Sequence, residues 1–295
     1  MKLENTIEEK QENKKGNTFK KILLIFLLFV VLFYLYIRFV EPNRLVVKEY
    51  AIVDNNLPYS FHGMKIVHFS DILYGTSMNE KNLEKVVEQI NSLKPDVVLF
   101  TGDLFNSSIK LNEEAKNKLK EILKKIEATY KKYAVVGDND YIDKNSFNDI
   151  MENAGFLILN NKNDFLYYGG NDPLLFIGTD SLLEKEYDIT AANTSSEDIT
   201  SVYKIWLSHE PIILDELQNE NITPNLIFTG HTLHGLIKTP FGGTLLKQQG
   251  VNHYVEAVYQ KENIKMYISS GLGTYKYNIR FLNPPSINLY RLYQY

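Results

Sequence analysis

The apolar run at residues 22–40 constrains this 295-residue chain more than any other feature. It reads ILLIFLLFVVLFYLYIRFV, and its one charge, Arg38, stands close enough to the end to reach lipid headgroups. A run of this length just spans a bilayer, whereas a buried core helix is rarely so long without Gly or polar breaks. The flank RFVEP contains no small-x-small cleavage pattern. We therefore predict an uncleaved transmembrane anchor over residues 22–40.

The residues before the anchor indicate its orientation. Residues 1–21 are polar, mixed in charge and without apolar periodicity, so we predict a mobile polar tail there. Four lysines lie between residues 14 and 21, and basic residues favour the cytoplasmic side of a span. We expect a single-pass protein of the cell membrane, with a cytoplasmic N-terminus and the main domain outside the cell.

Composition limits what the main domain can be. Hydrophobic residues make up 44% of the chain and charged residues 23%, which is enough apolar material for a sizeable core. The formal net charge of −4 argues against a nucleic-acid partner, because neutralising phosphates normally requires a basic surplus. The chain has no cysteine, so His and carboxylates are the only strong metal ligands that it offers.

The order of the predicted elements indicates the fold class. Residues 44–295 show no long linker and no repeat, and we predict one domain. Helical patterns at residues 81–93 and 112–130 alternate with apolar strands, and consecutive strands follow. This order predicts two mixed sheets packed face to face and covered by helices, with a surface loop at residues 184–203. The predicted strands lie in the runs KIVHFSD, DVVLFTGD, KYAVVGD, GFLILN, LLFIGTD, KIWLSHE, LIFTGH, YVEAVY, KMYISSG and SINLYRLY.

Several predicted strands end at a residue that can bind a metal. Loops from different strands converge beyond the carboxyl ends of a sheet, so these tips predict one cluster. Any single one of them could instead cap a loop or lie satisfied in the core. Oxygen and imidazole ligands suit Mn²⁺, Fe²⁺, Zn²⁺ or Mg²⁺, and a shared carboxylate is the usual bridge in dinuclear hydrolases. The predicted metal ligands are Asp71, Asp103, Asp138, His209 and His231.

The segments around these tips carry a family resemblance. The motifs SDILYG (70–75), TGDLFN (101–106), VGDNDY (136–141), LSHEP (207–211) and GHTLHG (230–235) resemble, in order, the five blocks of the calcineurin-like metallophosphoesterases. The segment SSGLGTYKYNIRFLNPPSINL (269–289) resembles the end of the membrane-anchored bacterial branch of that family. The resemblance covers about residues 50–295. It implies a four-layer α/β/β/α sandwich that holds two divalent metals and hydrolyses phosphoesters.

Two positions of the first metal site depart from the family pattern. Leu73 stands where the family's Asp-x-His block has its histidine, and Leu233 stands at the last position of the Gly-His-x-His block. His234 follows one residue later, and it could replace the lost ligand only if the loop bulges, because a one-residue shift turns a side chain to the opposite face. Asp71 and the shared Asp103 remain, so the resemblance implies that the ion of the first site is absent or labile.

The second site keeps a full set of four ligands by the same resemblance. Asp103 matches the bridging aspartate, and His209 and His231 match second-metal ligands, while Asp138 stands where the family has an asparagine. Four ligands are enough for one tightly held ion. Asn139 replaces the histidine that contacts substrate phosphate in the family, and an amide cannot give up a proton near neutral pH.

Three functions stay open at this point. In the first hypothesis the chain is a membrane-tethered phosphoesterase with one firm ion, and it acts on a lipid headgroup, an envelope substrate or a phosphorylated small molecule. In the second it is a catalytically degenerate scaffold that binds such a ligand or a membrane partner. In a third hypothesis it is a rewired dinuclear enzyme, in which His234, Asp140 or Asn106 moves into the first site. The candidate catalytic residues are Asn139, Asp140 and His234.

Overall fold

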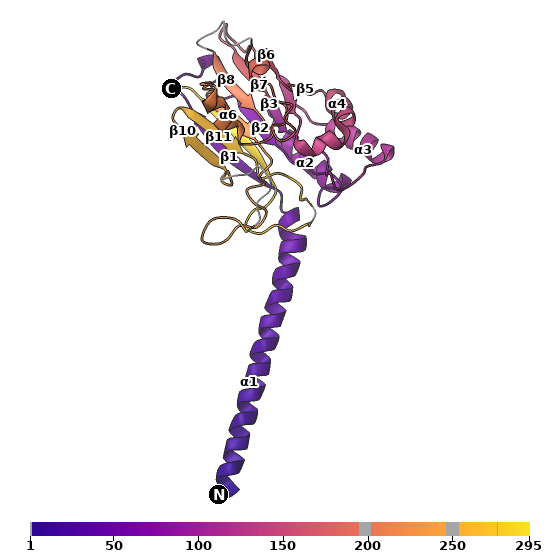
Figure 1. The fold of residues 1–295 in the computed structure, drawn as a ribbon, viewed down its shortest axis with the longest axis vertical. Helices are drawn as coiled ribbons and strands as arrows, with labels where there is room; N and C mark the ends of the chain where they lie inside the picture. The colour runs from indigo at the N-terminus through magenta and orange to yellow at the C-terminus, as the bar shows by residue number, and fades with distance from the viewer. Residues whose placement is uncertain (1, 195–201, 246–253, 276) are drawn as a thin grey trace.

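A long N-terminal helix leads into a domain of sheets and helices in the computed structural model, which describes residues 2–194, 202–245, 254–275 and 277–295 (Figure 1). Helix α1 (Lys2–Leu35) continues through a π-helical turn, Tyr36–Val40, and a 3-10 turn, Glu41–Asn43. The part Asn17–Asn43 is long and apolar enough to cross a membrane, and its large apolar side chains up to Leu35 are exposed. A core helix would bury such side chains, so α1 is not a core helix of this domain.

Helix α1 begins earlier than the sequence predicted. We predicted a mobile tail over residues 1–21, whereas the helix starts at Lys2. The Glu, Lys and Gln residues of this segment are good helix formers, and a long helix beside them removes the cost of nucleation. Absence of apolar periodicity was therefore no sign that the helix was absent.

Two six-stranded mixed sheets form the centre of the domain. The central strands of each sheet are parallel, and antiparallel partners join nearer the edges. The first sheet has, in spatial order, β1 (Val46–Val53), β12 (Ser286–Tyr293), β2 (Lys65–Phe69), β3 (Val97–Thr101), β4 (Lys131–Val135) and β5 (Leu157–Ile158). The second has β10 (Val258–Lys261), β11 (Ile264–Ile268), β9 (Leu226–Thr229), β8 (Tyr203–Leu207), β7 (Leu174–Gly178) and β6 (Lys162–Leu166).

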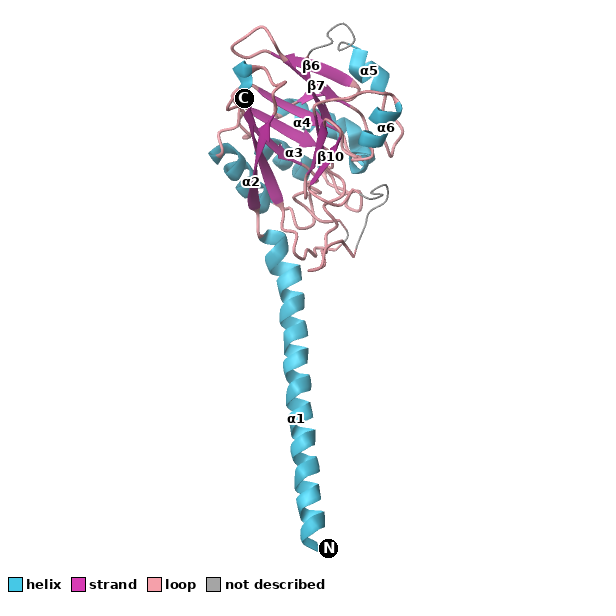
Figure 2. Ribbon diagram, turned by 90° about the vertical axis from the view of Figure 1, so that its left-hand side faces the viewer, coloured by secondary structure: helices cyan, strands magenta, loops and turns pink. Residues whose placement is uncertain are grey.

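Helices cover the outer face of each sheet and give four layers (Figure 2). Helices α2 (Glu80–Ser92), α3 (Glu113–Leu123) and α4 (Lys144–Asn153) lie on the first sheet, and α5 (Ile189–Asn193) and α6 (Ile213–Asn219) lie on the second. In α2 the buried residues Leu83, Val86, Val87 and Ile90 repeat at three- and four-residue spacing, which gives one apolar face. The side chain of Asn79 caps the helix by accepting a hydrogen bond from the Asn82 backbone.

Alternating side chains of the strands fill the space between the layers. In β3, Val98 and Phe100 pack against the helices, while Val97 and Leu99 face the second sheet. Apolar residues from both sheets meet in that middle core, among them Phe176 and Phe228. The predicted α/β/β/α sandwich with two mixed sheets is confirmed.

The topology brings α1 and the strand tips to the same end of the first sheet. Strand β12 runs antiparallel to β2, with Asn288 opposite His68, and β1 runs parallel to β12, with Val46 opposite Ser286. Strand β1 therefore starts where β2, β3 and β4 end, because these three strands are parallel. The chain leaves α1 at the edge of the domain where the predicted metal ligands follow their strands.

Several element boundaries differ from the predictions. The predicted surface loop at 184–203 contains the short helix α5, capped by the side chain of Asp188, while residues 195–201 lie outside the described residues. The helix predicted over 112–130 ends at Leu123, and the strand in YVEAVY begins only at Val258. Strands β1 and β6 and helices α4 and α6 were not predicted, because their exposed sides carry polar residues that blur the periodicity.

Candidate metal centre

Backbone conformation sets the direction of the side chains at the strand tips. Asp71, Asp103 and His231 each have a positive φ, of 50°, 61° and 65°. Non-glycine residues adopt this left-handed region at a cost of about 1–3 kcal/mol each, and such residues gather at functional sites. The surrounding structure therefore holds three of the five predicted ligands in turns that the chain would not adopt by itself.

Gly102 allows the loop that carries Asp103 to lie against the loop that carries Asp138. A β-carbon at this position would stand 2.6 Å from the Gly137 backbone nitrogen and 2.7 Å from His209 Nδ1. Any larger residue would separate the loop that carries Asp103 from the loop that carries Asp138. The glycine of the TGD segment is thus needed for the close approach of two acidic side chains.

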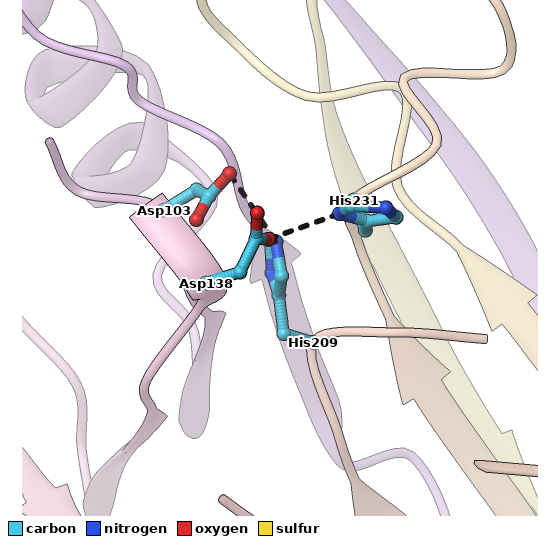
Figure 3. A group of neighbouring side chains, drawn as sticks. All are labelled: Asp103, Asp138, His209 and His231. Carbon is cyan, nitrogen blue, oxygen red and sulfur yellow. Dashed lines mark hydrogen bonds and ion pairs between the residues drawn. The ribbon is translucent and has the colours of Figure 1, made fainter. Parts of the chain in front are cut away.

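Four of the predicted ligands converge at the carboxyl ends of β3, β4, β8 and β9 (Figure 3). One ligand atom from each of them lies within 4.8 Å of the others. His209 Nε2 is 3.3 Å from Asp103 Oδ2 and 3.3 Å from Asp138 Oδ1, and His231 Nδ1 is 3.1 Å from Asp138 Oδ1. We call these four residues the metal group: Asp103, Asp138, His209 and His231.

Surrounding groups orient the members of the metal group. The carbonyl of Thr101 lies 2.6 Å from His209 Nδ1, and a carbonyl can only accept, so Nδ1 carries the proton and Nε2 stays available. Asn139 donates to both carboxylate oxygens of Asp103, from its backbone at 3.0 Å and from its side-chain amide at 2.7 Å. The hydroxyl of Tyr275 donates to Asp103 Oδ2 at 3.1 Å.

Carboxylates and imidazoles shift one another's pKa within the metal group. Burial opposes ionisation of Asp138, but the imidazoles of His209 and His231 beside it hold its pKa well below the usual range. Burial likewise works against protonation of His209, yet the nearby carboxylate of Asp103 raises its pKa well above 6.5. The pKa of His231 is raised in the same way, mainly by Asp138 and against burial. Positive charge is therefore strongly favoured at the point where these side chains meet.

The geometry of the metal group fits a divalent cation. Among the described residues, buried His209 Nε2 finds no hydrogen-bond partner, although two carboxylate oxygens stand 3.3 Å away. Two ligands of a tetrahedral ion with bonds of about 2.1 Å lie about 3.4 Å apart, which matches these separations. Two carboxylates and two imidazoles suit Zn²⁺, Mn²⁺ or Fe²⁺.

Asp71 lies beside the metal group, in a different environment. Its Oδ2 accepts from Ser70 and, at 3.2 Å, from the backbone of His231, while its buried Oδ1 has no partner. Burial raises the pKa of this carboxyl to about 6. A β-carbon on Gly271 would collide with Leu233 Cδ2 and stand 2.9 Å from the β-carbon of Asp71. Leucine thus packs at the place where the resemblance puts a histidine ligand.

The remaining candidates do not enter the first site. His234 Nε2 lies 2.8 Å from the carbonyl of Ile268, and burial lowers the pKa of this ring well below 6.5. Asn106 directs its amide to the carbonyls of Thr274 and Tyr275. The third hypothesis, in which these side chains rebuild the first site, is not what the structure contains.

Asp140 holds the loops of the metal group together. Its carboxylate accepts from the backbones of Asp103 and Gly137, at 2.9 and 3.0 Å, and from that of Phe105 at 3.0 Å. Burial and the charge of Asp103 raise its pKa to about 8. Every one of these contacts is with the loops, so its position is that of a support for the ligand Asp103.

Sequence reasoning missed two side chains near the site. Tyr275, which bonds Asp103, lies in the closing segment without any motif of its own. Arg280 is fully buried and donates to the carbonyls of four residues at 2.6–3.1 Å, and burial lowers its pKa to about 10. An arginine among apolar and small residues was the available signal. The four carbonyls belong to Ser270, Gly271, Gly273 and Asn283.

Comparison with known proteins places this geometry in context. The sequence profile of the calcineurin-like phosphoesterases matches residues 64–269. The uncharacterized metallophosphoesterase YkuE of Bacillus subtilis (strain 168) is 28% identical over 264 residues, which cover 88% of this chain and 89% of the relative. The UDP-2,3-diacylglucosamine pyrophosphatase LpxG of Chlamydia trachomatis is 27% identical and covers 88% of this chain and 93% of its own length. A transmembrane protein with metallophosphoesterase domain from Danio rerio is 23% identical over 94% of this chain and 64% of its own.

Proposed function

Because the chain belongs to the calcineurin-like phosphoesterase family, we propose that it is a membrane-anchored phosphoesterase that works with one divalent ion in the metal group. The observation that carries this proposal is the convergence of four ligand atoms within 4.8 Å, with His209 Nε2 buried and without a hydrogen-bond partner in the part of the chain that the structure describes. The described residues beside Asp71 offer one carboxylate and two leucines, so they form no complete ligand set for the second ion of the family.

The residues around the metal group define which phosphoesters suit it. A divalent ion held there supplies Lewis-acid activation of a phosphate ester. Asn139 fixes the carboxylate of Asp103 but cannot protonate a leaving group. A leaving phosphate, whose second pKa is near 6, needs such protonation far less than an alkoxide does. We therefore favour a pyrophosphate linkage as the bond that is cleaved.

The anchor narrows the substrate further. Helix α1 is long and apolar enough to span a bilayer, and we place the N-terminus in the cytoplasm and the domain outside the cell. A tethered enzyme meets lipid headgroups at high local concentration. The Chlamydia relative is named as a UDP-2,3-diacylglucosamine pyrophosphatase, and an acylated headgroup that carries a pyrophosphate linkage is the substrate class that we propose here.

A second candidate function rests on the replaced residues. Leu73 and Leu233 are fully buried, and Asn139 stands where the family has a proton donor. These residues favour a protein that binds a phosphorylated headgroup through its ion and does not turn it over. Binding without hydrolysis is the outcome that separates this function from the first.

The test uses the full-length chain in detergent micelles with Mn²⁺ and an activated phosphodiester. Metal-dependent hydrolysis that disappears in His231→Ala supports the enzyme. The matched control is His62→Ala, because His62 is exposed and lies at the other end of the first sheet. Retention of the ion without any turnover would favour the binding protein. Hydrolysis that is unchanged in His231→Ala would defeat the proposal.

A further inference from the structure

We propose that the loops 236–245 and 277–283 enter the same bilayer as α1 and hold the metal group's end of the domain against the membrane surface. The inference rests on the proposed function in one respect, namely that α1 spans a membrane. It adds an interaction surface, whose partner is the lipid bilayer. It also adds a consequence, since the metal group then faces lipids of the membrane that anchors the chain.

The two loops lie beside the end of α1 that joins the domain. Figures 1 and 2 both show loops at this edge of the domain reaching the level of the last turns of the helix. The backbone nitrogen of Arg280 donates to the carbonyl of Ile37 at 3.1 Å, and the ring of Phe281 packs edge-on against Phe33 at 5.0 Å. Glu41, which follows α1, accepts from the Asn283 backbone at 3.1 Å. Loop 277–283 is thus fixed against the helix.

The depth of these contacts follows from the length of the helix. The apolar run 22–40 is about 28 Å long at 1.5 Å per residue, and the hydrocarbon core is about 30 Å thick. The run has no length to spare, so its last residues must lie in the hydrocarbon or at its boundary. Phe33 precedes Val40 by about 10 Å along the helix axis. Phe281, which packs on Phe33, therefore lies within the bilayer and not above its surface.

Loop 236–245 is joined to the first loop and carries an apolar tip. Backbone bonds connect Phe281 with Leu236 and Lys238, each at 3.0 Å. The loop folds back on itself between Thr239 and Gly243, with Phe241 fully exposed in the turn. Such a bonded hairpin satisfies much of its own backbone, which is what an interfacial loop requires where water is scarce.

The exposed side chains of the two loops match a lipid surface. Phe241 is 100% exposed, Leu245 69%, Tyr277 65% and Leu282 49%, and all four stand in these two loops. Transfer of exposed apolar and aromatic side chains from water into lipid lowers the free energy, and tyrosine is enriched at the membrane–water interface. The contact of loop 277–283 with the apolar part of α1 selects the bilayer as the occupant, since α1 itself requires one.

Absence of cysteine from the chain allows a clean labelling test. Three variants of the full-length protein, Phe241→Cys, Val31→Cys and Tyr59→Cys, each receive a nitroxide label and are reconstituted into vesicles of phosphatidylcholine and phosphatidylglycerol. Val31 lies in α1, and Tyr59 is 75% exposed in the connection between β1 and β2, at the far end of the first sheet. Power saturation compares collisions of each label with oxygen, which enters lipid, and with a water-soluble nickel chelate.

We expect the oxygen-to-nickel accessibility ratio of the Phe241 label to be several-fold above that of the Tyr59 label. It should be close to the ratio of the Val31 label. A Phe241 ratio equal to that of Tyr59, with Val31 reporting lipid, would overturn the loop insertion alone. An aqueous ratio at Val31 would overturn both the span and this inference. A label on Tyr277→Cys repeats the measurement on the second loop, and it too must report lipid or the interface.

Discussion

Two neighbouring halves of one site share left-handed turns and differ in their side chains. Asp103 and His231 of the metal group have positive φ angles of 61° and 65°, and Leu73 and Leu233 beside Asp71 have values of 46° and 47°. The first half brings carboxylates and imidazoles together, and the second packs leucine around one carboxylate. The comparison teaches that fold and loop geometry can present a site while the side chains decide whether an ion has ligands.

The largest expected effect comes from the same substitution made in each half. Asp103→Asn should weaken Zn²⁺ binding by about 100- to 1,000-fold, because binding of roughly 10–16 kcal/mol is shared among four ligands. Asp71→Asn should lower the affinity about tenfold, the lower limit of the loss expected for an outer-shell partner, because Asp71 accepts from the backbone and not from the ring of His231. Titration of full-length protein against a competing chelator measures both. Equal losses in the two variants would show that Asp71 is a ligand of the same ion.

The variant Arg280→Met tests whether the stability of the half around Asp71 is independent of metal binding by the metal group. Its guanidinium holds the backbone around Gly271, and Arg280→Met leaves four carbonyls without that donor. We expect the free energy of unfolding to fall by about 3 kcal/mol, the cost of unsatisfied buried groups. Arg291→Met, at a half-exposed position, should cost less than about 1 kcal/mol. Urea unfolding at neutral pH reports both values.

Metal affinity provides the contrast for the same variant. The metal group has its own supports in Thr101, Asn139 and Asp140, none of which contacts Arg280 in the hydrogen bonds of the described residues. Folded Arg280→Met should therefore bind Zn²⁺ within roughly threefold of the parent chain. A loss as large as that of Asp103→Asn would mean that the two halves are not independent.

Restoring histidine should convert the leucine half into a second metal site. The double substitution Leu73→His and Leu233→His places imidazoles on turns that already have the left-handed conformation. We expect a second ion to bind about 10- to 100-fold more tightly than in the parent chain, a modest gain because no prepared partner orients the new rings. Mass spectrometry of the intact protein counts the ions. The single variant Leu73→His is the control, and two ions in the parent chain would remove the basis of the comparison.

A further prediction concerns the pH dependence of stability that His68, a histidine outside the metal group, produces. Burial lowers the pKa of His68 to about 3, whereas the unfolded chain has the ordinary value near 6.5. Between these values the unfolded state binds a proton that the folded state does not, so stability falls as pH falls, by about 1.4 kcal/mol per pH unit. His68→Gln should flatten this acid limb between pH 6.5 and 3 by that amount.

The fluorescence of Trp206, the one tryptophan and a fully buried one, follows unfolding in urea at each pH. Tyr59→Phe, an exposed aromatic replacement, serves as the control and should leave the slope unchanged. An acid limb that is equally steep in His68→Gln would contradict the buried neutral state of this ring.

Much of the fold was predictable because its central strands are short apolar runs that end in polar tips. Strands β2, β3, β8 and β9 lie where the sequence predicted them, and the four-layer arrangement is confirmed. Edge elements were missed, since β1 mixes Lys48 and Glu49 into an apolar run and a half-exposed strand gives a weaker signal. The predicted start of the N-terminal helix was wrong. Helix propensity and continuity with the apolar helix, and not apolar periodicity, determine the structure of residues 2–21.

The site was predictable in its ligands and less so in its supports. Motif spacing selected the four residues that the structure brings within 4.8 Å. The role of Asp140 as a link between the loops of Asp103 and Gly137 could not be read from the sequence, because a carboxylate in a motif has the same signature as a support or as a catalyst. The position of the His234 ring could not be predicted either, because it depends on the path of the loop, which turns the ring toward the carbonyl of Ile268.

The central claim is that one half of the site holds an ion and the other does not. Mass spectrometry of the intact full-length protein, loaded with Mn²⁺ in detergent and dialysed into metal-free buffer, measures this directly. We expect one retained ion per chain, which is lost in His231→Ala. Two retained ions, or none, would contradict it.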